Sequence, residues 1–148
     1  MINYKHNEGV KIIAEELIKL GIEVQYSTER EMPIDIIAEL QNNITIKLIV
    51  RIVSPESQYT WIEKSKLDTE DEHLFIAALY RKSNINNIIY LLPATNWKHD
   101  NPPFRIKNYD KPGLVSKPEY GINFSQKTLE LIENYRLQII VSKLAGSK

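Results

Sequence analysis

Three charged side chains, Asp35, Lys47 and Arg51, have residue types and a spacing that could support chemistry. They fall within residues 34–51, IDIIAELQNNITIKLIVR, where polar and apolar residues alternate on both sides of an interruption at 41–43. Successive side chains of a strand point to opposite faces, so the alternation predicts a β-hairpin with one apolar face. The three charged residues share its other face, where a carboxylate could bind a metal ion or form an ion pair with a cation.

The placement of the turn decides which residue lies opposite Asp35. A loop formed by residues 41–43, which tolerate turn conformations, pairs Asp35 with Ile49 and makes both cations its diagonal neighbours. A loop formed by residues 42–44 instead pairs Asp35 with Arg51. The sequence leaves both registers open, and in both an acid and one or two cations share a face.

Hydrophobic periodicity, together with helix-capping residues and prolines, predicts the elements that position this hairpin. Asn7 is a suitable N-cap and Gly21 a suitable C-terminal stop for a first helix, and Ser125 is a suitable N-cap for a last one. The region from Pro93 to Phe124 holds five of the seven prolines and is predicted to be a long loop. The predicted order is a helix at 7–20, strands at 22–26, 34–40 and 44–52, a polar connector with a short helix to about residue 72, strands at 73–80 and 87–92, the loop, and a helix from 126 to 144.

This order predicts an α/β fold with a mixed central β-sheet flanked by helices, formed as one domain over residues 1–148. Nineteen basic residues balance nineteen acidic ones, so no global field attracts nucleic acid or an anionic membrane, although a local basic patch can suffice. The absence of cysteine excludes a disulfide scaffold and thiolate sites. No apolar segment has the length of a membrane span, and the start does not have the pattern of a signal peptide, so we expect a cytoplasmic protein.

The order of elements and several short motifs resemble the PD-(D/E)XK nuclease-like superfamily, most closely its small prokaryotic members of unassigned function. The resemblance implies a restriction-endonuclease-like core of helix, three strands, connector, two strands and helix. The matching segments are the helix between Gly9 and Gly21, Pro33-Ile34-Asp35-Ile36-Ile37, Ile49-Val50-Arg51, Tyr90-Leu91-Leu92-Pro93 followed by Trp97, and Pro118-Glu119-Tyr120-Gly121-Ile122.

The resemblance also implies a degenerate site. In active members the acidic residues hold a divalent metal and a lysine helps to position or activate the attacking water. Here Asp35 is retained, Ile49 and Val10 stand at positions where acids are expected, and Arg51 replaces the lysine. Arg51 keeps the charge but cannot readily release a proton. Lys47 is the alternative cation, two residues along the same face; Asp35 is the metal ligand if the site is active, with Mg²⁺ as its cofactor, and otherwise we expect no cofactor.

Two further residue groups are candidates for binding. His6, His73 and His99 lack the short spacing of a helical metal pair, and we interpret them as structural or exposed. Aromatic residues interleaved with basic pairs could bind single-stranded nucleic acid or could simply anchor a solvated loop. The basic pairs are Lys64/Lys66, Arg81/Lys82, Arg105/Lys107 and Lys111/Lys117, and the interleaved aromatics are Trp97, Phe104 and Tyr109.

Three functions therefore stand as hypotheses: a catalytically inactive nuclease-like domain that binds nucleic acid or protein, an active Mg²⁺-dependent endonuclease with migrated site residues, and a structural subunit of a larger assembly. Candidate partners are nucleic acid, another protein, or a second copy of the chain, and no membrane. The homodimer rests on the last helix, where Leu131 and Leu137 fall outside the apolar stripe and widen it beyond one contact.

Overall fold

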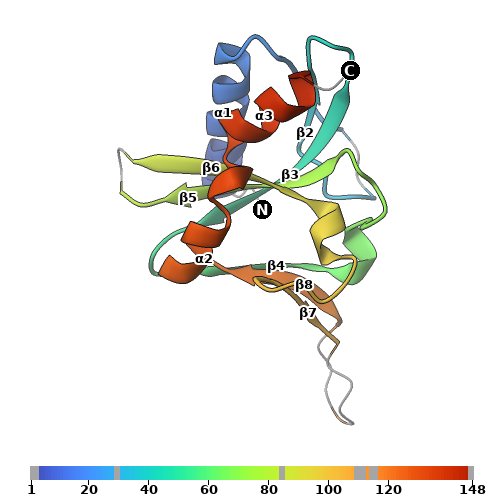
Figure 1. The fold of residues 1–148 in the computed structure, drawn as a ribbon, viewed down its shortest axis with the longest axis vertical. Helices are drawn as coiled ribbons and strands as arrows, with labels where there is room; N and C mark the ends of the chain where they lie inside the picture. Colours follow the sequence, from blue (N-terminus) through green and yellow to red (C-terminus); the bar gives the residue numbers. More distant parts are fainter. Residues whose placement is uncertain (1–3, 29–30, 84–85, 109–112, 114–116, 147–148) are drawn as a thin grey trace.

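The computed structural model describes residues 4–28, 31–83, 86–108, 113 and 117–146, which form two β-sheets with helices on the outside (Figure 1). A five-stranded main sheet has the order β1-β2-β3-β5-β6, and a small sheet has the order β4-β8-β7. The elements are α1 (Tyr4–Lys19), β1 (Glu23–Tyr26), β2 (Ile36–Glu39), β3 (Thr45–Val53), β4 (Tyr59–Glu63), the 3₁₀ helix η1 (Lys64–Lys66), β5 (Leu74–Arg81), β6 (Asn87–Pro93), η2 (Ala94–Trp97), β7 (Phe104–Lys107), β8 (Glu119–Asn123), α2 (Gln126–Leu131), η3 (Glu133–Tyr135) and α3 (Leu137–Gly146).

The predicted hairpin forms β2 and β3, and its register is the one given by the 41–43 loop. Ile36 pairs with Leu48 in antiparallel fashion, which excludes the register with a 42–44 loop. Asn43 adopts a left-handed conformation with φ of 67°, as the last residue of a three-residue hairpin loop commonly does. The regular strand begins at Ile36 rather than at Ile34, so β2 is shorter than predicted. The mixed sheet is confirmed, because β3 and β5 are parallel while the other neighbours are antiparallel.

Helix α1 covers one face of the main sheet, as predicted. Its buried residues Ile13, Ala14 and Leu17 pack in the same core as strand residues that include Ile46 and Leu48. Helix α1 starts at Tyr4, so Asn7 lies inside it and the predicted N-cap is wrong. The predicted stop is confirmed at Gly21, whose φ is +80° and whose N–H donates to the Ile18 carbonyl at 2.9 Å.

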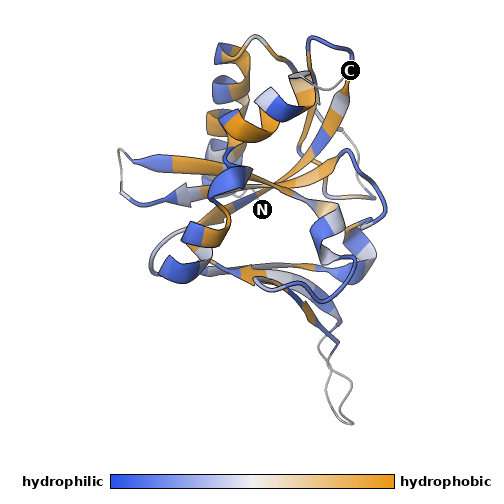
Figure 2. Ribbon diagram, viewed as in Figure 1, coloured by the Kyte–Doolittle hydropathy of each residue, from blue (hydrophilic) through white to orange (hydrophobic). Residues whose placement is uncertain are grey.

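The small sheet covers the other face of the main sheet and encloses a second core (Figure 1). This sheet corrects two predictions, because β4 lies in the supposed polar connector and β7 and β8 lie in the supposed long loop. Its strands are coloured mainly hydrophilic or intermediate in Figure 2, in contrast to the apolar strands of the main sheet. The residues of this second core include Ile49, Ile76, Tyr90, Leu92, Trp97, Phe104, Ile122 and Phe124.

The chain after Ser125 is broken into α2, η3 and α3, so the predicted single helix is wrong. Ser125 does cap α2, since its hydroxyl accepts from the Thr128 N–H at 3.3 Å. The break turns Leu137 into the core, where it is 1% exposed, while Leu131 stays 58% exposed. The wide apolar stripe therefore does not exist as one surface, and the homodimer stays a prediction that rests on Leu131 alone. None of the helices within the described residues combines the length and the apolar character needed to cross a membrane.

Candidate functional site

Asp35 lies at the point where β2 separates from β3. Its backbone N–H donates to the Leu48 carbonyl at 2.9 Å, and its carboxylate Oδ2 accepts from the Val50 N–H at 2.7 Å. The side chain thus takes the place that a backbone carbonyl of a continuing strand would occupy beside β3. The other oxygen, Oδ1, lies 2.9 Å from His6 Nε2 on α1. Because a carboxylate only accepts hydrogen bonds, the imidazole donates from Nε2.

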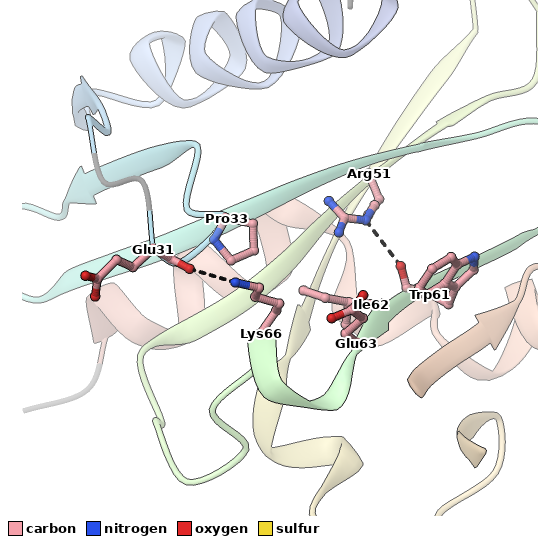
Figure 3. Close-up of a pocket in the computed structure, with 7 residues that line it drawn as sticks. All are labelled: Glu31, Pro33, Arg51, Trp61, Ile62, Glu63 and Lys66. Atoms are coloured by element: carbon pink, nitrogen blue, oxygen red, sulfur yellow. Dashed lines mark hydrogen bonds between the residues drawn. The ribbon is translucent and has the colours of Figure 1, made fainter. Parts of the chain in front are cut away.

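This geometry corrects the expected pairing of the acid. The sequence predicts that Asp35, as a half-buried structural carboxylate, forms an ion pair with Arg51 or Lys47. In the structure the partner of Asp35 is instead His6. Lys47 forms an ion pair with Asp71 at 2.5 Å. Arg51 donates from its guanidinium to the Val50 carbonyl at 3.0 Å and to the Trp61 carbonyl at 3.5 Å (Figure 3). Asp35 and Arg51 are near enough to interact electrostatically, but they contact α1 and β4, which lie on opposite faces of the main sheet, so the predicted shared face is wrong. Lys47 is not part of the same arrangement.

Arg51 is half-buried between the two sheets. Burial lowers the pKa of the Arg51 guanidinium, and the negative charge of Asp35 acts in the opposite direction. Arginine stays protonated even when its pKa falls, because its ordinary pKa is so high. Arg51 is therefore a fixed positive charge, and its two carbonyl contacts orient the planar group.

Two hollows meet at Arg51. The smaller, of about 500 Å³, lies between the edge of β4 and the segment before β2, and its lining includes Arg51, Pro33, Trp61 and Lys66 (Figure 3). The larger, of about 800 Å³, lies between the first turns of α1 and the ends of β3 and β5. Its charged lining consists of Lys5, Arg51, Arg81 and Lys82 against Glu8 and Glu56, together with His6. Arg51 lines both hollows, which together we call the cleft, and the larger one, beside α1, has an excess of positive charge.

The residues around Asp35 do not fit a divalent metal ion. Both carboxylate oxygens are engaged by protein donors, as described above. Ile49, at an acidic position of the resemblance, is completely buried, and Val10 is equally unable to coordinate a cation. Mg²⁺ needs several oxygen ligands, which these residues do not provide. Within the described part of the chain, no three His, Asp or Glu side chains gather closely enough to hold a metal.

Sequence reasoning missed two residues of the cleft. His6 is structural, as expected, but the sequence does not predict its contact with Asp35; it lies seven residues before Ile13 and therefore on the same side of α1. Starting the helix one turn earlier would have placed it on the side of the sheet. Trp61 falls in the predicted polar connector, because no long periodic pattern marks β4.

The interleaved aromatic residues divide into two groups. Trp97 and Phe104 are buried and pack edge to face with centroids 4.8 Å apart, so they anchor the chain rather than bind a base. Tyr109 and Lys111 lie outside the described residues. Arg105 and Lys107 are on β7, away from Arg51 and its cleft.

Comparisons with known proteins agree with this architecture. The chain is similar to the Holliday junction resolvase Hjc of the archaeal hyperthermophile Archaeoglobus fulgidus, with 13% identity, 97% of this chain and 98% of that chain covered, and a TM-score of 0.54. It is also similar to the bacterial homing endonuclease I-Ssp6803I, with 14% identity, 97% and 94% coverage, and a TM-score of 0.55. No protein-family model matches the sequence, and no curated protein matches it significantly.

Both similar structures are nucleases with the restriction-endonuclease-like fold. Identities this low establish the fold and leave the chemistry to the residues of the site. The five-stranded mixed sheet flanked by helices is the architecture that matches these two structures. The chain therefore has the restriction-endonuclease-like fold of the PD-(D/E)XK nucleases.

Proposed function

We propose that the protein is a nucleic-acid-binding module built on a nuclease fold, and that it binds without metal-dependent cleavage. The observation that carries the proposal is the contrast between two neighbours. The carboxylate of Asp35 is fully engaged in holding α1 to β3, while the guanidinium of Arg51 lines an open cleft.

The cleft supports binding through its charge. Its larger part has four lysine or arginine side chains against two glutamates, in a chain whose formal net charge is zero. Positive charge gathered in a concave surface attracts phosphate even when the whole protein is neutral. Arg51 suits a phosphate contact because its planar group donates in pairs and is already oriented. Both similar structures are proteins that act on nucleic acid, as their names state.

The side chains around Asp35 support the proposed lack of cleavage. A metal at Asp35 would have to displace the His6 imidazole or the Val50 N–H and would find only aliphatic side chains at Ile49 and Val10. Arg51, which stands in the place of the lysine, is a poor proton acceptor. The positions that supply a metal and an activated water in active members supply neither here.

The proposal is tested by binding and cleavage on one labelled substrate. Fluorescence polarisation of a labelled DNA duplex should show binding that weakens steeply as salt rises, because bound cations on the phosphates are released. The same duplex incubated with the protein and millimolar Mg²⁺ or Mn²⁺ should remain intact on a denaturing gel. Metal-dependent cleavage that disappears in Asp35→Asn would overturn the proposal in favour of an active nuclease. No binding at low salt would overturn it in favour of a structural or protein-binding role.

A further inference from the structure

The outer face of the small sheet carries a second set of aromatic and basic side chains. Alternation along β4 sends Thr60 and Ile62 into the core, and the paired residues Ile122 and Phe104 face the same way. The residues between them form the opposite surface, which we call the outer face. It consists of Tyr59, Trp61, Glu63, Arg105, Lys107, Glu119, Gly121 and Asn123.

One row of the outer face places an exposed aromatic ring beside a cation. Trp61 pairs with Gly121, and Gly121 pairs on its other side with Arg105. Two strand spacings separate Trp61 from Arg105, which is about 10 Å. Trp61 is 50% exposed, and in Figure 3 its indole points away from Pro33 and Lys66. An indole on a sheet with a free face is a surface on which a flat ligand can stack.

Tyr59 fixes a second cation on the same face. Its ring lies across Gly121, where a Cβ would come within 2.0 Å of the tyrosine Oη. The Tyr59 hydroxyl donates to Glu119 at 2.5 Å, and Lys107 Nζ lies 4.4 Å from the centre of the ring. The cation–π contact holds the ammonium group of Lys107 above the sheet. Glycine at position 121 therefore makes the space that positions Tyr59, and Tyr59 positions Lys107.

A cavity of about 400 Å³ continues from this face toward α2. Its described lining contains three cations, Arg105, Lys107 and Lys127, and no carboxylate, together with exposed Leu131. The two acids of the outer face, Glu119, which accepts from Tyr59, and Glu63, which lies 3.9 Å from Lys117, do not line this cavity. The volume is that of a small-ligand pocket, and its charge is complementary to phosphate.

We infer that the outer face binds an unpaired, single-stranded segment of nucleic acid, with a base stacked on Trp61 and phosphates beside Arg105, Lys107 and Lys127. The inference rests on the proposed function for the class of ligand and adds a second surface and a preference for unpaired bases. A duplex hides the faces of its bases, whereas a single strand exposes them to an aromatic side chain. Residue 61 joins the two surfaces, since its carbonyl accepts from Arg51 in the cleft while its indole is on the outer face.

The two tryptophans give the experiment a direct readout. Trp61 is half exposed, and Trp97 is 1% exposed and donates to the Gly121 carbonyl at 3.0 Å. Titration of the protein with an oligothymidylate of about 16 nucleotides should quench the emission of Trp61 through stacking. Trp61→Phe keeps an aromatic ring on the face but leaves only buried Trp97 to emit, so its emission should not change on titration.

Affinity variants separate stacking from phosphate contact. By fluorescence polarisation of the labelled oligothymidylate, Trp61→Ala should bind at least about five-fold more weakly, the effect of losing one stacked base. Arg105→Ala should lower the slope of log affinity against log salt by about 0.7, the share of one phosphate contact on a single strand. Lys11→Ala removes an exposed cation from α1, on the opposite side of the main sheet, and should change neither quantity.

Quenching that persists unchanged in Trp61→Phe, or affinity that is equal in wild type, Trp61→Ala and Arg105→Ala, would overturn the inference. A duplex of the same length distinguishes this failure from failure of the proposed function. If duplex binding still depends on Arg51 while Trp61 and Arg105 have no effect on the oligothymidylate, the cleft binds nucleic acid and the outer face does not. If neither nucleic acid binds, both proposals are wrong.

Discussion

The imidazole of His6 and the carboxylate of Asp35 join the first helix to the centre of the main sheet across 2.9 Å. The same carboxylate accepts the N–H of Val50, so one side chain ties α1, the start of β2 and the middle of β3 together. The exposed fractions of the two side chains are 30% and 20%, which keeps most of the contact away from solvent. A residue that the resemblance assigns to metal binding is thus part of the scaffold in this chain.

Exchanging Asp35 should reveal this structural role. Asp35→Ala leaves the buried Val50 N–H without an acceptor and should lower the free energy of unfolding by about 2–4 kcal/mol. Asp35→Asn should lose much less, because its amide oxygen can accept from Val50 while its NH₂ donates to the other tautomer of His6. Urea denaturation of the three proteins measures both effects. Equal losses for the two variants would show that the contacts described here do not stabilise the fold.

The ion pair between Lys47 and Asp71 predicts a pH-dependent contribution to stability. Desolvation pushes the pKa of Asp71 upward, but hydrogen bonds from Lys47 and from the His73 N–H, with the nearby positive charges, bring it below its ordinary value of 3.8. The folded state therefore favours the ionised acid. Its contribution is complete above the unfolded pKa and is lost as pH falls through the lower folded pKa.

Asp71→Asn should accordingly be less stable than wild type near neutral pH, by no more than about 1 kcal/mol for a partly exposed pair. The difference should narrow as pH is lowered below about 4. Thermal denaturation followed by circular dichroism from pH 7 to pH 3 tests this. A difference that grows toward acid pH would mean that the sign of the linkage is wrong.

Gly121→Ala should displace Tyr59 from the outer face. The new methyl group would lie 2.0 Å from the tyrosine Oη, and the ring would have to leave both Glu119 and Lys107. We expect a loss of about 1–3 kcal/mol from this overpacking. Gly146→Ala is the matched control, because a Cβ there meets nothing within 4 Å.

A double-mutant cycle assigns the loss to this one contact. If the clash with Tyr59 is the cause, Gly121→Ala should cost little more in a Tyr59→Ala background, where the ring is already absent. The same cost in both backgrounds, measured by urea denaturation, would place the strain in the backbone of β8 instead.

The sequence was sufficient to predict the hairpin because the signals there are local. Ile46 and Leu48 alternate with Thr45 and Lys47, and the interruption at 41–43 limits the register to two choices. The small sheet could not be predicted in the same way. Thr60 pairs with Ile122, which lies far along the chain, and each strand of the small sheet buries only one to three residues. Its pattern is therefore too short to distinguish a strand from a loop.

The candidate site was predicted in part for a related reason. The alternation predicted Asp35 and Arg51 on neighbouring strands, whereas the structure places Arg51 on β3 and Asp35 one residue before β2. Periodicity also cannot predict which donor reaches a carboxylate. The donor that reaches Asp35 is His6, whose position depends on where α1 starts, and helix ends are the least certain part of any prediction from sequence. Lys47 forms its ion pair with Asp71, which precedes β5. Alternation within the hairpin could not predict a partner from another part of the chain.

The salt dependence of duplex binding most directly tests the claim that the cleft binds nucleic acid. The slope of log affinity against log salt is proportional to the number of phosphates that the protein contacts. Arg51→Gln and Lys82→Ala should each lower the slope of log affinity against log salt by about 0.9, the share of one contact on a duplex. Lys19→Ala, on α1 about 20 Å from Lys5, should leave the slope at the wild-type value. Thermal denaturation of each variant checks that the fold is intact. Slopes that are the same in all four proteins, or no binding by folded wild-type protein, would contradict the account.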